Sequence, residues 1–134
     1  MVLFYLTLYY RYHYYFYKMT DATKTTIHRD FLFVKSEYKL IKIILGDVLF
    51  LSGLRDYTQI YIKGKNTPLT TLQNLKEFES KLSANEFIRV HRSYIVSIKQ
   101  IDTITRSEII IGNHRIPIGI SYKPALDEMI EKNS

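Results

Sequence analysis

The sequence predicts a mainly β protein with one or two short helices. After Asp30 most of the chain consists of short runs of β-branched and aromatic residues, each bounded by Gly, Asp, Lys or Asn. Only two stretches show the apolar spacing of a helix. With 134 residues and no cysteine, the chain has room for one domain, which must be stabilised by a hydrophobic core rather than by disulfides.

The first half of this region predicts four strands and one helix. The strand runs are residues 31–34, 40–44, 48–51 and 57–62. After Pro68, an apolar stripe at helical spacing predicts an amphipathic helix, with Thr70 and Gln73 as its capping box. The stripe consists of Leu72, Leu75, Phe78 and Leu82.

The second half predicts a polar junction, three strands and a short helix. In residues 87–96 two apolar stretches flank the junction His91-Arg92-Ser93, and further strands are expected at 101–104, 108–111 and 115–118. Gly112-Asn113 favours a tight hairpin, and Pro117 favours an edge strand or a bulge. Ser121 is predicted to cap a terminal helix that carries Leu126, Met129 and Ile130.

The first 20 residues differ in composition from the rest of the chain. They contain seven tyrosines, two phenylalanines and no acidic residue. Arg11 and His13 interrupt the run, which argues against a membrane-spanning helix, and no cleavage site of a signal peptide follows it. We expect an arm or interfacial segment followed by a Thr-rich linker. The predicted organisation is therefore an arm and linker over residues 1–30 and a domain over residues 31–134.

The positive charge is concentrated in the second half of the domain. The whole chain carries +6, which permits binding to nucleic acid or to an anionic membrane surface. Residues 87–123 hold six basic and two acidic residues, whereas residues 124–134 hold one basic and three acidic residues. A phosphate backbone would therefore meet its counter-charge near the polar junction.

Three segments resemble the LytTR DNA-binding domain, the output module of response regulators. Residues 87–96 match its F-x-R-x-H-R-S-Y-x-V segment, residues 47–57 its I-x-Y-I-E-x-x-x-x-Y segment, with Ser52 in place of Glu, and residues 115–122 its closing I-P-V-S-R-x-Y segment. The resemblance covers residues 31–123. It implies an elongated stack of small antiparallel sheets that binds direct repeats in DNA as two protomers, with loops in successive major grooves.

The resemblance also implies which residues contact DNA. Arg92 is expected to reach a phosphate or a guanine edge and Ser93 a phosphate, while His91 either contacts the backbone or braces the loop. Many relatives have a basic residue where this chain has Ile120, so Lys123 is expected to take over its phosphate contact. The full predicted set is Arg55 and Thr58 in one loop, Arg89, His91, Arg92 and Ser93 in the second, and Ser121, Tyr122 and Lys123 in the third.

No enzyme site is predicted. The chain has no Gly-rich phosphate loop and no paired-carboxylate spacing within one element, and its four histidines are scattered. We therefore expect no cofactor and no metal. The expected partners are double-stranded DNA, a second protomer on DNA, and a separate sensor or receiver, all in the cytoplasm. The alternative is a membrane-tethered or protein-interaction module whose β domain has lost DNA recognition.

Overall fold

The computed structural model describes residues 29–134, so the predictions for residues 1–28 lie outside the described residues. Ten strands, two α-helices and three 3₁₀ turns follow one another in this part of the chain. The elements are β1 (Phe31–Ser36), β2 (Lys39–Ile44), η1 (Leu45–Asp47), β3 (Val48–Leu54), β4 (Tyr57–Ile62), β5 (Leu69–Thr71), α2 (Leu75–Lys81), β6 (Phe87–His91), β7 (Tyr94–Ser97), η2 (Ile98–Gln100), β8 (Thr103–Ile104), β9 (Glu108–Ile111), β10 (His114–Pro117), η3 (Ile120–Tyr122) and α3 (Lys123–Lys132).

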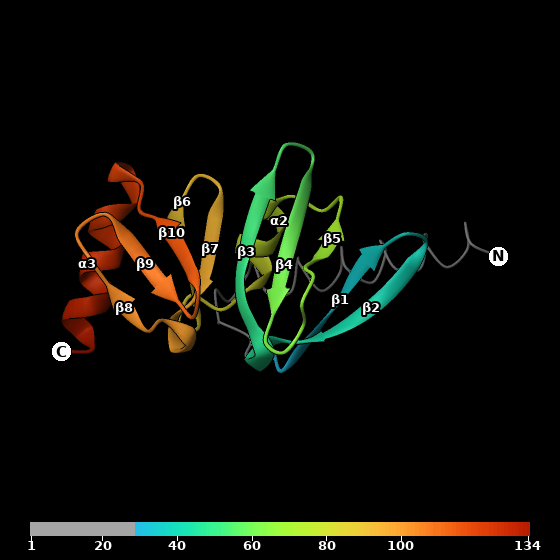
Figure 1. Ribbon diagram of the computed structural model, residues 1–134, viewed down its shortest axis with the longest axis horizontal. Helices are drawn as coiled ribbons and strands as arrows, with labels where there is room; N and C mark the ends of the chain where they lie inside the picture. Colours follow the sequence, from blue (N-terminus) through green and yellow to red (C-terminus); the bar gives the residue numbers. More distant parts are fainter. Residues whose placement is uncertain (1–28) are drawn as a thin grey trace, which may run out of the picture.

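The strands form three separate antiparallel sheets that are stacked along the long axis of the molecule (Figure 1). The central sheet has five strands in the order β5-β4-β3-β7-β6. The hairpin β1–β2 lies on one side of it, and the sheet β10-β9-β8 lies on the other. This arrangement confirms the predicted mainly β fold and its elongated stack of small sheets.

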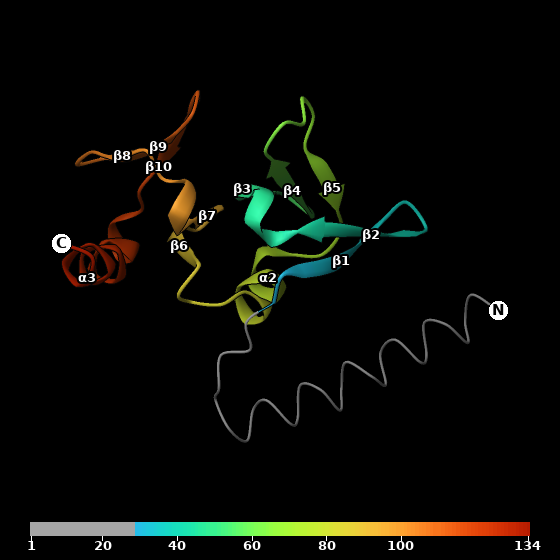
Figure 2. The same cartoon turned by 90° about the horizontal axis from the view of Figure 1, so that it is seen from below.

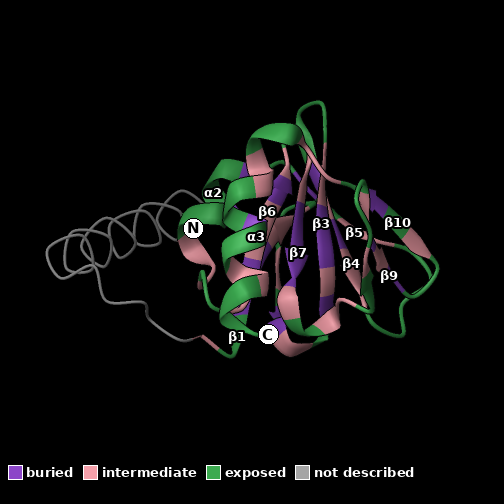
Figure 3. Ribbon diagram, turned by 90° about the vertical axis from the view of Figure 1, so that its left-hand side faces the viewer, coloured by how far each residue is buried: buried purple, intermediate pink, exposed green. Residues whose placement is uncertain are grey.

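Each face of the central sheet covers its own hydrophobic core, because successive side chains of a strand point to opposite faces. In β7, Ile95 belongs to the first core, with β1, β2 and α2, and Val96 belongs to the second, with β8–β10 and α3. Figure 3 shows the result, with the central strands buried and the outer face of α3 exposed. The two cores hold the central sheet rigidly and so fix the turns at its ends.

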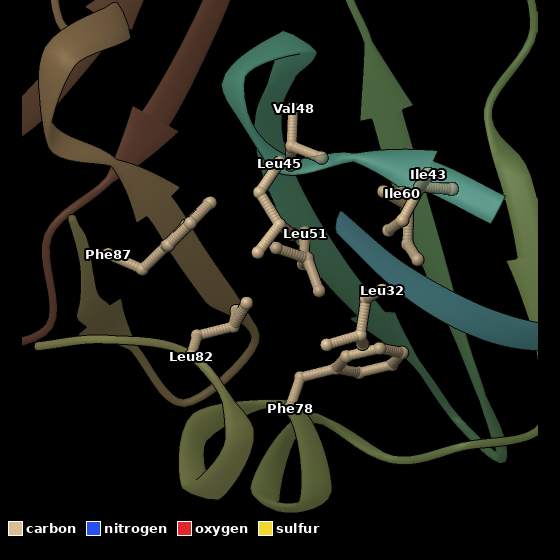
Figure 4. Close-up of a pocket in the computed structure, with 9 residues that line it drawn as sticks. All are labelled: Leu32, Ile43, Leu45, Val48, Leu51, Ile60, Phe78, Leu82 and Phe87. Carbon is tan, nitrogen blue, oxygen red and sulfur yellow. The ribbon is translucent and has the colours of Figure 1, made fainter. Parts of the chain in front are cut away.

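The first core has a small, partly open void of about 10 Å³ beneath the central sheet (Figure 4). All the side chains around it are apolar, so a water there would find no hydrogen-bond partner. The lining comes from β1, β2, η1, β3, β4, α2 with its C-cap residue, and β6. It consists of Leu32, Ile43, Leu45, Val48, Leu51, Ile60, Phe78, Leu82 and Phe87. The predicted apolar runs of the first half therefore meet in the first core, and those at residues 101–118 contribute to the second.

The predicted start of the first helix is wrong. Thr70 lies in β5, where it pairs with Gln59, and Leu72 is 78% exposed. The N-cap is Asn74, whose side chain accepts a hydrogen bond from the Glu77 N–H at 2.9 Å. Sheet pairing of residues 69–71 thus overrides the helical spacing, which is valid only from Leu75 onward.

The second half of the chain follows the prediction except at two points: the strand expected at 101–104 covers only Thr103–Ile104, and Ser121 is not a helix cap. Gly112, with φ 57°, forms the turn between β9 and β10, and Pro117 lies in the edge strand β10. Ser121, however, lies within η3 and caps nothing, because α3 begins at Lys123 with Tyr122 as an N-cap that makes no side-chain hydrogen bond. The cap prediction for Ser121 is therefore wrong.

Candidate nucleic-acid interface

Three loops that are far apart in the sequence lie along one edge of the molecule, the upper edge in Figure 1. They are the β3–β4 turn, the β6–β7 turn and η3. The Gly53 N–H donates to the Ser93 carbonyl at 2.8 Å, which ties the first loop to the second. The Gly119 N–H donates to the Val90 carbonyl at 2.8 Å, which ties the third loop to the strand that leads into the second.

The β6–β7 turn is braced from within by His91. Its Nδ1 accepts a hydrogen bond from the Ser93 N–H at 3.0 Å, and its ring lies 5.6 Å from the ring of Tyr94. Of the two roles expected for His91, the structure therefore shows the brace. With Nδ1 as acceptor, the neutral ring carries its proton on Nε2, which can donate to a ligand. Arg92 lies between His91 and Ser93, and its side chain is exposed.

Arg89 holds the same turn through its guanidinium. Its Nε donates to the His91 carbonyl at 3.2 Å and its Nη2 donates to the Arg92 carbonyl. Its Nη1 forms an ion pair with Glu79 Oε2 at 2.8 Å, and its side chain is only 19% exposed. The guanidinium also lies 5.9 Å from the ring centre of Tyr122. Each of its three nitrogens thus donates a hydrogen bond inside the protein, which makes Arg89 a positioning residue.

The β3–β4 turn presents Arg55 but not Thr58. Arg55 and Asp56 form its exposed tip, and Arg55 has φ 55°. Thr58 is 0% exposed, and its hydroxyl donates to the Gln73 carbonyl at 2.6 Å. The prediction that Thr58 contacts DNA is therefore wrong, since the side chain is buried and its donor is used. Within the described part of the chain, no ion pair joins Arg55 to Asp56.

The third loop presents its side chains from η3 and the start of α3. Ile120 is 87% exposed, Ser121 is exposed, and Tyr122 and Lys123 are half-buried. A Cβ on Gly119 would lie 3.0 Å from the Tyr122 ring and 3.6 Å from the His91 Cα. This close approach places η3 directly beside the β6–β7 turn.

The sequence predictions missed two kinds of residue at this edge. Glu79 anchors Arg89, but an acid on a different element ten positions earlier gives no periodic signal. Arg106 is exposed on the β8–β9 turn, and the Ile118 N–H donates to the adjacent Ser107 carbonyl at 3.0 Å, next to the segment that leads to η3. The sequence signal that could have identified Arg106 is its place among the basic residues of 87–123.

Residues 29–134 contain neither a cluster typical of a metal site nor a helix typical of a membrane span. No group of three or more His, Cys, Asp or Glu side chains there is arranged to hold a metal ion. No helix in the same residues has both the length and the apolar character needed to cross a bilayer. The pKa of Lys81 is lowered, mainly by burial, but Lys81 lies at the end of α2 and in none of the three loops.

Comparison with known proteins agrees with this geometry. The family model of the LytTr DNA-binding domain matches residues 38–131, which is well over half of the chain. A solved structure of a LytTr DNA-binding domain from Bacillus cereus is similar with a TM-score of 0.64 and 26% identity, over 77% of this chain and 98% of that one. No curated protein gives a significant match. The chain belongs to the LytTr DNA-binding domain family.

Proposed function

We propose that this protein is a sequence-specific DNA-binding transcription regulator that reads the major groove with the three loops of its upper edge. The observation that carries this proposal is the exposed Arg92 on a turn that His91 and Arg89 hold rigidly. A side chain presented from a rigid turn loses little entropy on binding, so more of its contact energy appears as affinity.

Each loop has a distinct role in the proposed complex. Arg92 can reach two acceptors of a guanine edge or a phosphate, and Ser93 and His91 Nε2 can donate to phosphate. Ser121, Tyr122 and Lys123 contact the backbone from the third loop, and Arg55 does so from the first. The three loops of one protomer offer only a few contacts to DNA. Two protomers on direct repeats would together supply the contacts of a full site. A separate sensor or receiver partner in the cytoplasm would supply the signal.

The experiment that tests this function is a selection of binding sites from random duplexes with the purified protein, followed by titration at several salt concentrations. We expect enriched sites that contain two repeats in the same orientation. Affinity for these sites should exceed affinity for unselected duplexes by at least about 10³-fold. Equal binding to selected and unselected duplexes would contradict a sequence-specific regulator.

Lys123→Ala should reduce the salt dependence of DNA binding. If the ammonium meets one phosphate, the slope of log affinity against log salt should fall in magnitude by about one. The matched control is Lys132→Ala at the other end of α3, where the lysine pairs with Glu128 at 3.4 Å. Titrations at four salt concentrations measure both slopes, and an unchanged slope for Lys123→Ala would remove this contact.

Ile120 should contact the C5-methyl group of a thymine. An apolar side chain that is 87% exposed on the edge with the three loops can recognise only an apolar group, and thymine presents one in the major groove. Replacing one thymine of the selected site by uracil should therefore weaken wild-type binding by about fourfold, which corresponds to about 0.8 kcal/mol for one methyl. The Ile120→Ser variant should not respond to this replacement. Ile44→Ser, at an exposed position beside η1 and the β4–β5 turn on the opposite edge, should respond as the wild type does.

A further inference from the structure

The hairpin β1–β2 has an apolar face that points away from the first core. Its cross-strand pairs Phe31–Ile44 and Phe33–Lys42 lie on this face, which we name the hairpin face. Phe31, Phe33 and Ile44 are 44–47% exposed. The opposite face of the same hairpin carries Leu32, Val34 and Ile43, which are buried in the core. Figure 2 shows that the hairpin extends beyond the body of the central sheet.

The side chains of the hairpin face are ordered against one another. The rings of Phe31 and Phe33 meet edge to face with centres 5.7 Å apart. The Lys42 ammonium lies 4.3 Å from the centre of the Phe31 ring. Rings with exposed edges beside a cation form a surface that suits further aromatic rings, through T-shaped and cation–π contacts.

The chain enters β1 at one end of this hairpin. The Leu45 N–H donates to the Asp30 carbonyl at 2.9 Å, which fixes the entry of the chain at the end of the hairpin that carries Phe31 and Ile44. The residues before this point include the first 20, with seven tyrosines and two phenylalanines. Residues 21–28 can span up to about 28 Å when extended, which exceeds the length of about 20 Å of a six-residue strand.

We infer that the hairpin face is the docking surface for the aromatic residues 1–20 of the same chain. Three half-exposed side chains offer roughly a few hundred Å², far less than the ~800 Å² per partner of a stable interface between separate molecules. A tethered segment needs less area, because its effective concentration reaches the millimolar range. The matching chemistry is ring against ring, and the rings of Phe31 and Phe33 supply it.

Disulfide trapping in the full chain tests this inference, because the protein has no cysteine of its own. Thr7→Cys, within the aromatic segment, is combined with Lys42→Cys on the hairpin face. The matched control combines it with Lys39→Cys, an exposed lysine of the same strand three positions away and therefore on the opposite face. Non-reducing gels and peptide mapping measure the rate of cross-linking at two protein concentrations.

The pair with Lys42→Cys should cross-link within one chain, about tenfold or more faster than the pair with Lys39→Cys, at a rate independent of protein concentration. Adding Phe33→Ser to this pair should slow its cross-linking toward the rate of the control pair. Covalent dimers whose formation accelerates with protein concentration would overturn the inference in favour of a second copy. Equal rates for the two pairs would overturn it as well. So would cosedimentation of the wild type with phosphatidylglycerol vesicles that Phe33→Ser abolishes, since the face would then bind lipid.

Discussion

Phe87→Ala is expected to lower the free energy of unfolding by about 3–5 kcal/mol, the usual cost of truncating a buried aromatic ring. Phe87 is 6% exposed and lines the void in the first core, so the truncation would enlarge a space that is already unfilled (Figure 4). A loss of this size is a large part of the stability of a domain of this length. Urea denaturation followed by circular dichroism measures it.

Leu72→Ala is the control for this prediction. Leu72 is a large apolar residue that is 78% exposed, so its truncation should change stability by less than about 0.5 kcal/mol. Equal denaturation midpoints for Phe87→Ala and the wild type would mean that Phe87 does not contribute to the core. Binding to the selected duplex should be measured only well below the denaturation midpoint, so that loss of folding is not taken for loss of contact.

Arg92→Ala should weaken specific DNA binding by about 1–3 kcal/mol, or roughly five- to 150-fold in Kd. The variant should keep its turn, because Arg89 is bonded to the backbone carbonyl of residue 92 and not to its side chain. The loss should be smaller for unselected duplexes if Arg92 contacts a base, and equal for all duplexes if it contacts only phosphate. Gel-shift titration with both kinds of duplex distinguishes the two contacts.

The control for Arg92→Ala is Lys65→Ala, which removes one exposed positive charge from the β4–β5 turn. That turn lies on the opposite, lower edge of Figure 1. Lys65→Ala should leave specific binding nearly unchanged. If both variants bound as the wild type does, Arg92 would have no part in recognition.

The elements that local pattern determines could be predicted from the sequence. The strand runs, the Gly112 turn and the edge position of Pro117 all follow from β propensity and turn chemistry, and the structure has them. The start of α2 could not, because pairing of Thr71 with Thr58 in the neighbouring strand decides it. The helical preference of a segment is overridden where the segment can pair with a neighbouring strand.

The candidate site was predictable as a region but not residue by residue. The polar junction at residues 91–93 proved to be the tip of a hairpin on the shared edge. Thr58 was misplaced although the alternation of β4 puts it on the same face as the buried Ile60. The bracing role of Arg89 could not be read from the sequence, because it depends on Glu79 from a helix that packs against the sheet.

In the proposed complex, the edge with the three loops is the DNA-binding surface. The most direct measurement is an NMR titration of the ¹⁵N-labelled protein with the selected duplex, in which every backbone amide reports separately. We predict shifts concentrated in residues 54–57, 91–94 and 119–123, with residues 63–66 at the opposite edge unchanged. Shifts concentrated at residues 63–66, where Lys63 and Lys65 form the other exposed basic turn, would contradict the claim.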